Sequence, residues 1–172
     1  GAALLRDYSD DRGNRGLLVT PKERLESAVA KAERCGIQAN THAIGDRGNR
    51  LVLDVYAELP HADRAQRRLR VEHAQIVHPD DIPRFSALHV IASMQPVHAT
   101  SDMPWAQARV GRERLFGAYA WQRFRKQGTL LAFGSDFPVE MVDPFHGLYA
   151  AITRQDADGQ PDGGWLPDQR LG

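Results

Sequence analysis

The sequence is short of cysteine, of net charge and of long apolar runs, and each shortage disfavours a class of protein. The only cysteine, Cys35, cannot form an internal disulfide, which suits a reducing compartment, and we expect a cytoplasmic protein. Lys plus Arg and Asp plus Glu both number 22, so no net charge attracts nucleic acid or an anionic membrane. No apolar run approaches the roughly 18 residues that span a bilayer, and the first residues lack the basic-then-apolar order of a secretory signal. We therefore expect neither nucleic acid nor a membrane as a partner.

What remains is the composition of an ordinary globular protein. Of the 172 residues, 42% are hydrophobic and 26% are charged, so the chain can bury a core, and one compact domain over residues 1–172 is the natural expectation. The first residue is Gly and not Met, and the closing stretch GWLPDQRLG stops without a terminating element. We therefore expect both ends of the chain to be cut.

Helix-like and strand-like segments alternate along the chain. A helix is expected from Pro21 to Gly36, because Leu25, Val29 and Ala32 share one face at helical spacing. Further helices are expected over residues 46–59, 78–88 and 118–128, strands over 37–45, 68–75, 89–97 and 129–139, and a long polar connection over 99–117. This repeated alternation favours βα units and a parallel sheet, and therefore an α/β fold.

Three of the expected strands end in residues that can bind a metal: His42, His73 and Asp136. His73 follows His42 by 31 residues, and Asp136 follows His73 by 63 residues, which is close to one and two βα repeats. Because reactive groups in parallel sheets gather at the carboxyl ends of the strands, we expect the three side chains on one rim. Imidazole nitrogens and a carboxylate oxygen suit zinc and similar divalent ions, and Asp136 could also accept a proton from a metal-activated water.

Each of these residues also has an ordinary structural explanation. A single histidine at a strand end is more often a hydrogen-bonded structural residue, and an aspartate in a turn is often a helix cap. The regular spacing of three strand ends makes coincidence a weaker explanation. The pattern by itself nevertheless leaves the metal site and the structural roles open.

Four motifs add a resemblance to a known family. THAIGDRGN, VEHAQ, QPVHATSD and FGSDFPVE, in this order and spacing, resemble the amidohydrolase superfamily, in particular its YtcJ-like branch, which includes N-substituted formamide deformylases. The resemblance implies a (β/α)8 TIM-type barrel, of which this chain holds roughly strands five to eight with their helices, and one or two divalent metals, usually zinc. By position, it assigns His42 to the ligand after strand five, His73 to the ligand after strand six, and Asp136 to the strand-eight aspartate that is ligand and general base.

Other parts that the resemblance leads one to expect are missing. No His-x-His pair occurs in the sequence. Lys22, Lys31 and Lys126 fall in or beside expected helices, so none of them can replace the bridging lysine near strand four. The small β-sandwich domain, which the family builds from both chain ends, also lies outside the sequence. The resemblance therefore implies the C-terminal half of a barrel with an incomplete metal site.

Three further residues are weaker candidates for contact with a substrate. His98, Asp102 and Trp105 lie in the expected polar connection after the third strand, where a substrate-facing loop would be placed. A solvated loop, with Trp105 as an anchor, explains them equally well.

Other polar residues bear on the choice of reaction or are expected to be structural. Deaminases of the superfamily place a glutamate three residues after the histidine that corresponds to His42, and that position is Gly45 here, which favours simple hydrolysis. Asp46 is expected to cap the helix that it begins, and Glu72 is expected to form a salt bridge. Histidines near element starts are expected to be structural, namely His61, His78 and His89.

The leading hypothesis is a zinc-dependent hydrolase that cleaves amide, formamide or related C–N bonds of a small molecule, with Asp136 managing the proton. With at most three metal ligands and half of a barrel, the chain alone is expected to be inactive. One alternative is a non-catalytic half-barrel that forms a homo-oligomer through its exposed sheet edge. Another is deamination, or cleavage of a lactone or phosphoester, because a shared fold does not fix the reaction.

Overall fold

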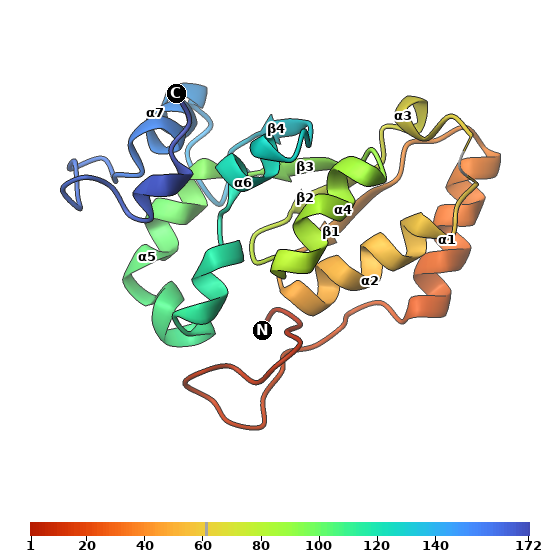
Figure 1. Cartoon of the computed structure of the whole chain (residues 1–172), viewed down its shortest axis with the longest axis horizontal. Helices are drawn as coiled ribbons and strands as arrows, with labels where there is room; N and C mark the ends of the chain where they lie inside the picture. Colours follow the sequence, from red (N-terminus) through yellow and green to blue (C-terminus); the bar gives the residue numbers. More distant parts are fainter. Residues whose placement is uncertain (61) are drawn as a thin grey trace.

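Four strands form one parallel sheet at the centre of the computed structural model, which describes residues 1–60 and 62–172. His61, expected to be structural, lies outside the described residues. The strands stand in the order β1 (Asn40–Ala43), β2 (Arg70–His73), β3 (Ile91–Met94) and β4 (Leu131–Phe133). Helical structure follows each strand, as Figure 1 shows. The predicted α/β fold with a parallel sheet is confirmed.

The sheet is covered by helices whose apolar faces form the core. α2 (Asp46–Ala57) packs on β1, α4 (Ile82–Ala87) on β3, and α6 (Trp121–Lys126) on β4, while α1 (Lys22–Arg34) lies against α2. Phe85 and Phe124 join α4 to α6, with ring centroids 4.8 Å apart and edge to face. Three shorter elements are the helix α3 (Arg64–Arg67) and the 3₁₀ turns η1 (Pro79–Asp81) and η3 (Pro167–Gln169). In the described part of the chain, no helix has both the length and the apolarity needed to cross a membrane.

The structure corrects the polar connection expected over residues 99–117. α5 runs from Pro96 to Val110, packs against α7 (Pro144–Thr153), and is followed by the 3₁₀ turn η2 (Glu113–Gly117). Pro96 suits the first helical position, where its missing N–H has no intrahelical partner to lose. The buried face of α5 includes Ala99, Ala106 and Val110. This periodicity is weak in the sequence because it rests on small residues and is interrupted by Pro104 inside the helix.

The opening segment is fastened over the start of α2. Asp46 lies in the first turn of α2, where an acidic residue was expected, but its side chain accepts a hydrogen bond from the Leu5 N–H at 2.8 Å and not from an amide of its own helix. The Arg47 N–H donates to the Ala3 carbonyl at 3.2 Å. A Cβ added to Gly45 would lie 2.1 Å from the same oxygen, so only glycine permits this close approach. The opening segment is therefore held by long-range contacts with the start of α2, which sequence rules for helix capping do not predict.

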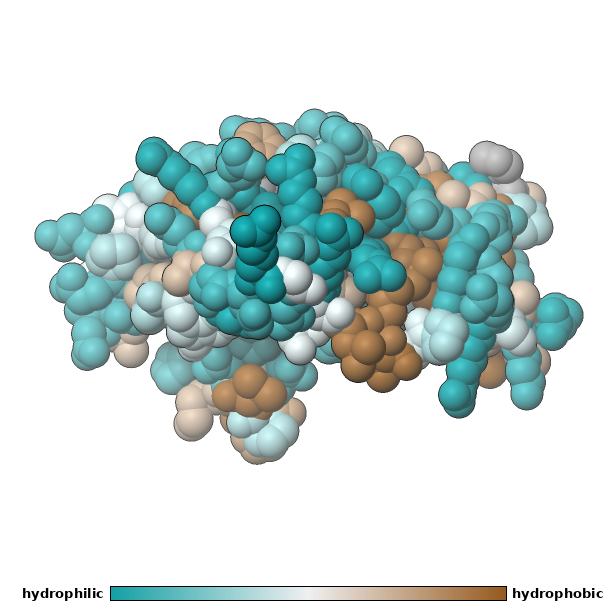
Figure 2. Space-filling model, turned by 90° about the horizontal axis from the view of Figure 1, so that it is seen from below, coloured by the Kyte–Doolittle hydropathy of each residue, from teal (hydrophilic) through white to brown (hydrophobic). Residues whose placement is uncertain are grey.

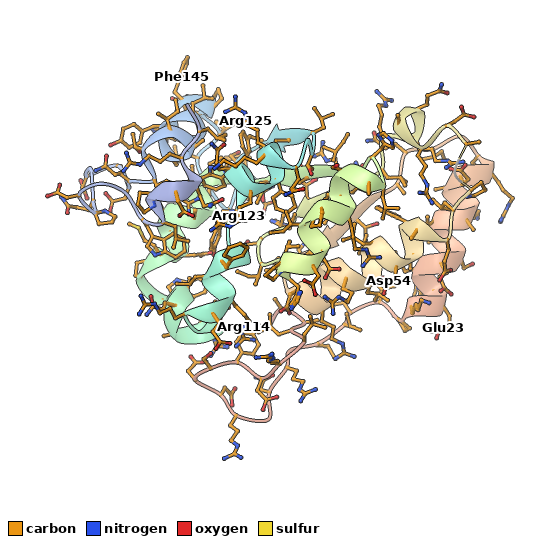
Figure 3. All side chains as sticks on the ribbon, viewed as in Figure 1. Glu23, Asp54, Arg114, Arg123, Arg125 and Phe145 are labelled. Atoms are coloured by element: carbon orange, nitrogen blue, oxygen red, sulfur yellow. The ribbon has the colours of Figure 1, made fainter. Side chains whose placement is uncertain are left out.

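Apolar side chains are exposed beside both edges of the sheet, where β1 and β4 each have one strand neighbour among the described residues. The larger group follows β4 and continues along α7: Phe133, Phe137, Val139, Met141, Val142, Phe145, Leu148 and Ile152. Figure 3 shows Phe145 pointing outward from α7. Leu17 and Val19, which precede α1, are also exposed, and Figure 2 shows an apolar patch right of centre, where this stretch crosses the surface. Exposed apolar groups of this size are typical of surfaces that interact with another molecule.

Candidate metal centre

One cavity collects every site residue proposed from the sequence. It has a volume of about 470 Å³, and its lining includes His42, His73, His98, Asp102, Trp105 and Asp136. The three metal-site candidates come from the strand ends, since His42 lies in β1, His73 ends β2, and Asp136 follows β4. A cavity of about 950 Å³ lies between the opening segment and the end of α5, but it contains none of these six residues.

The backbone turns sharply at two of the three strand-end residues. His73 has a φ of 76° and Asp136 a φ of 56°, both in the left-handed region that residues with a Cβ seldom occupy. Such strain is concentrated at functional sites, where the surrounding structure holds it in place. The parallel register pairs His73 with Ala43, the residue after His42, so two of the predicted residues lie at adjacent positions of neighbouring strands.

Three imidazoles and one carboxylate meet in the cavity. The ring centroids of His42 and His73 are 4.5 Å apart at an angle of 74°, and those of His73 and His98 are 5.8 Å apart and nearly parallel. One ligand atom from each of His73, His98 and Asp136 lies within 4.8 Å of the other two. His98, which sequence reasoning treated only as a weak substrate contact, therefore lies beside two of the residues expected to bind metal.

The protonation and hydrogen bonding of these histidines fit a metal ion. Burial lowers the pKa of His42 and of His73, which favours the neutral imidazole that a metal requires. His73 is only 6% exposed, and its Nδ1 and the buried Nε2 of His98 have no hydrogen-bond partner among the described residues. Buried polar atoms are normally paired, so two unpaired imidazole nitrogens beside a carboxylate are suited to a divalent ion.

A second polar cluster forms another wall of the cavity. The Tyr119 hydroxyl and the Gln75 amide both donate to Asp102 Oδ2, and the Gln75 amide also lies 2.8 Å from the Tyr119 oxygen. Burial raises the pKa of Asp102 above its ordinary value. Trp105, half exposed, lines the same space. Sequence reasoning missed Gln75, which stands in the VEHAQ motif two residues after His73, and Tyr119, which had no local signal.

The loop that carries Asp136 is tied to α5. The Ser101 hydroxyl donates to Glu140 Oε1 at 2.8 Å, and Glu140 also lines the cavity. Since Asp136 and Glu140 belong to the same loop, this bond helps to fix the loop beside His98 and Asp102. Neither Ser101 nor Glu140 was singled out in the sequence.

Two residues expected to be structural have that role. Glu72 forms an ion pair with Arg70 at 2.7 Å and accepts a hydrogen bond from Ser93 at 2.6 Å, so the predicted salt bridge is confirmed. His78 Nδ1 accepts a hydrogen bond from the Asp80 N–H at the start of η1. These contacts hold the strands and turns around the cavity.

Comparison with known proteins identifies the family. A family model described as "Amidohydrolase family" (Amidohydro_3) matches residues 2–171. The chain belongs to the amidohydrolase family. The resemblance inferred from four short motifs is therefore confirmed.

Two curated relatives match nearly the whole chain. Protein LONG AFTER FAR-RED 3 of Arabidopsis thaliana is 36% identical over 172 residues, which are 99% of this chain and 29% of that protein. YtcJ of Bacillus subtilis (strain 168), which is named as an amidohydrolase, is 35% identical over 159 residues, which are 92% of this chain and 30% of that protein. The chain thus spans less than a third of the length of either relative.

Two solved structures show where this fold recurs. Uncharacterised metal-dependent hydrolases from Pyrococcus furiosus and Pyrococcus horikoshii OT3 each superpose with a TM-score of 0.81, at 30% and 32% identity. The match covers 98% and 97% of this chain but 33% and 34% of those chains. The βα repeat of this amidohydrolase chain therefore resembles part of a TIM-type barrel, in agreement with the sequence prediction.

Proposed function

We propose that this chain is the C-terminal half of a metal-dependent hydrolase barrel that cleaves amide, formamide or related C–N bonds in small molecules. The observation that carries the proposal is the meeting of His42, His73 and Asp136 from three strand ends in one cavity. The active species is the complete protein, by which we mean this chain together with the remaining strands of a barrel. Relatives and solved structures about three times as long support that view.

The residues of the site have two roles, which are metal binding and proton transfer. His42 and His73 offer neutral imidazoles, because burial lowers the pKa of each. A bound divalent ion, for which we propose Zn²⁺, supplies a Lewis acid that lowers the pKa of water toward about 7. Asp136 is an acceptor in its ionised form, so it both contacts the ion and takes up the proton released as the carbonyl is attacked.

The cavity wall opposite these residues is suited to an amide-bearing small molecule. A volume of about 470 Å³ falls in the ordinary range for small-molecule sites. The face of Trp105 offers an apolar contact, while Asp102 Oδ1, which accepts no hydrogen bond from Gln75 or Tyr119, offers an acceptor to a substrate N–H. We assign these residues to binding and not to bond cleavage.

The packing around Gly45 favours hydrolysis over deamination. A proton-shuttling glutamate at this position would need a Cβ, and that atom would lie 2.1 Å from the Ala3 carbonyl oxygen. The opening segment therefore leaves no room for the side chain that distinguishes the deaminases. The contact at Gly45 does not disfavour lactone or phosphoester cleavage, so the test below includes both reactions.

The exposed apolar residues beside β4 support an inactive isolated chain. In the complete protein we assign this surface, with Phe137, Val139 and Phe145 among its residues, to contact with the other part of the barrel. A second copy of the chain is the alternative occupant. The exposed cysteine Cys35 is compatible with the cytoplasmic location that we also propose.

The test measures turnover by the complete protein and by the 172-residue chain. The substrates are N-substituted formamides and amides for C–N hydrolysis, amino-heterocycles for deamination, and lactones or phosphoesters for the other reactions. The proposal predicts metal-dependent turnover of formamides or amides by the complete protein and none by the chain alone. Sedimentation of the chain distinguishes the two candidate partners of the surface beside β4. A stable dimer would favour a second copy of the chain, and a monomer would favour the remaining part of the barrel. Turnover confined to lactones, phosphoesters or amino-heterocycles would contradict the assignment to C–N hydrolysis of amides.

A further inference from the structure

We infer that Arg154 is a positioning residue of the proposed substrate site, where it fixes Tyr119 and, through Tyr119, the orientation of the Asp102 carboxylate in the cavity wall. The inference rests on the proposed function and extends it to a residue outside the cavity. Arg154 follows the last residue of α7 and is not among the residues that line the cavity. Any effect of Arg154 on a substrate must therefore pass through Tyr119, which does line it.

The guanidinium of Arg154 is a buried charge without a carboxylate partner of its own. The residue is 0% exposed, and its Nη2 has no hydrogen-bond partner among the described residues. Burial lowers the pKa of Arg154 to about 9, so the group is still charged at neutral pH. Asp168 opposes this shift, but its carboxylate pairs with Arg123 at 2.7 Å. A charge in such a place is unfavourable unless other groups stabilise it, so its neighbours indicate its role.

Two tryptophans and two carbonyl oxygens stabilise the charge of Arg154. The guanidinium carbon lies 4.1 Å from the ring centroid of Trp121 and 5.4 Å from that of Trp165, within the range of cation–π contacts. Arg154 Nε donates to the Trp165 carbonyl at 2.8 Å, and Nη1 donates to the Tyr119 carbonyl at 2.9 Å. One planar group thereby joins the closing segment of the chain to the wall of the cavity.

The backbone of Tyr119 is strained and is fixed at both ends. Its φ of 48° lies in the left-handed region, which is unfavourable for an aromatic residue. The Tyr119 N–H donates to the Gln75 carbonyl at 2.7 Å, while the Tyr119 carbonyl accepts the bond from Arg154. The Tyr119 hydroxyl donates to Asp102 Oδ2, which leaves Oδ1 for a substrate N–H. Arg154 thus sets the position of the hydroxyl, and the hydroxyl sets the orientation of the carboxylate.

The closing segment packs closely around Arg154. The Trp165 N–H donates to the Arg154 carbonyl at 2.8 Å, so these two residues are hydrogen-bonded in both directions. Gly164 has a φ of 77°, and a Cβ added to it would lie 2.9 Å from the Cβ of Arg154. The Trp165 ring meets the Tyr119 ring edge to face, with centroids 5.3 Å apart. Arg154, Trp165 and Tyr119 therefore form one packed unit.

Steady-state kinetics of the complete protein test the inference, with the N-substituted formamide or amide that it cleaves. Arg154→Lys keeps the charge but loses the planar fork, so we expect KM to rise about 5- to 20-fold, with kcat within about twofold and the metal content unchanged. Tyr119→Phe should raise KM similarly, and the double variant should be no worse, because both changes release the same carboxylate. Arg64→Lys is the matched control. Arg64 also donates to two carbonyls, those of Ala57 and Leu59, but it does not line the cavity, so its KM should be that of the wild type.

Fluorine NMR of the complete protein labelled with fluorotyrosine is a second readout, which needs no turnover. The Tyr119 resonance is the one that Tyr119→Phe removes, and Arg154→Lys should shift it while Arg64→Lys leaves it in place. If circular dichroism shows that Arg154→Lys does not fold, Trp121→Phe takes its place, because it keeps the guanidinium but weakens its cation–π contact. That variant should shift the same resonance and raise KM about two- to fivefold.

The contrary outcomes separate this inference from the proposed function. An unchanged KM, or a Tyr119 resonance that does not move, would overturn the positioning role and leave the proposed hydrolase function intact. A fall in kcat at unchanged KM would also contradict the inference, because the role assigned to Arg154 is in binding. If the wild type cleaves no formamide or amide, the proposed function fails, and the NMR result alone decides whether Arg154 fixes Tyr119.

Discussion

The rings of His42 and His73 meet edge to face with their centroids 4.5 Å apart, although 31 residues of chain separate them. The contact follows from the parallel register, which pairs Ala43 with His73 at the ends of β1 and β2. Burial at this position lowers the pKa of both imidazoles. Two neutral histidines are thereby held side by side at the edge of the sheet where the proposed chemistry takes place.

The close approach of the opening segment to α2 predicts that Gly45 cannot be replaced without cost. Gly45→Ala would place a Cβ 2.1 Å from the Ala3 oxygen, so we expect the free energy of unfolding to fall by about 1–3 kcal/mol. Urea denaturation measures the change. Gly147→Ala in α7 is the control, because its Cβ meets no atom within 4 Å, and it should be neutral or slightly stabilising. Equal stability of the Gly45 variant and the wild type would mean that this packing is wrong.

The hydroxyl of Tyr119 is predicted to stabilise the wall of the cavity. Tyr119→Phe keeps the ring but removes the donor to Asp102 and the acceptor of the Gln75 amide, so the free energy of unfolding should drop by about 1–3 kcal/mol. Tyr149→Phe removes a hydroxyl from a residue that is 41% exposed and should change stability by less than about 0.5 kcal/mol. Indistinguishable denaturation midpoints for the two variants would refute the hydrogen-bonded cluster.

The buried Tyr56 should make stability fall in alkali. Burial raises the pKa of Tyr56 from 10.0 to about 12, so the folded state holds this proton more tightly than the unfolded chain does. The stabilisation is complete below pH 10 and is lost as the pH rises from 10 to about 12. At full extent it amounts to about 2–3 kcal/mol. Stability measured against pH should show this decline in the wild type and a shallower one in Tyr56→Phe, whereas identical slopes would contradict the assigned shift.

Much of this fold could be predicted from the sequence because its signals are local. The helix α1, and the positions of His42, His73 and Asp136 in or just after their strands, follow from apolar periodicity and from the spacing of one and two βα repeats. α5 was not predicted, since its buried face is built mostly from small residues and Pro104 interrupts the helix. Where the local signal is this weak, packing against another element, here α7, decides whether the segment forms a helix.

The site was predictable only in part for the same reason. Three strand-end residues could be recognised because position on a parallel strand fixes position on the rim. The unpaired nitrogen of His98 and the contact of Tyr119 with Asp102 depend on how α5 folds back over the strand ends. No sequence rule places residues 119 and 75, which are 44 positions apart, within one hydrogen bond of each other.

The central claim is that His73 and Asp136 belong to a metal-dependent hydrolytic site, and metal content together with turnover in the complete protein tests it most directly. His73→Ala should lose most of its bound metal and its turnover, while Asp136→Asn should lose turnover by at least about 100-fold, whether or not the metal remains. Asp162→Asn, on the exposed turn near the end of the chain, should behave as the wild type does. Wild-type metal content and wild-type turnover in both site variants would contradict the account.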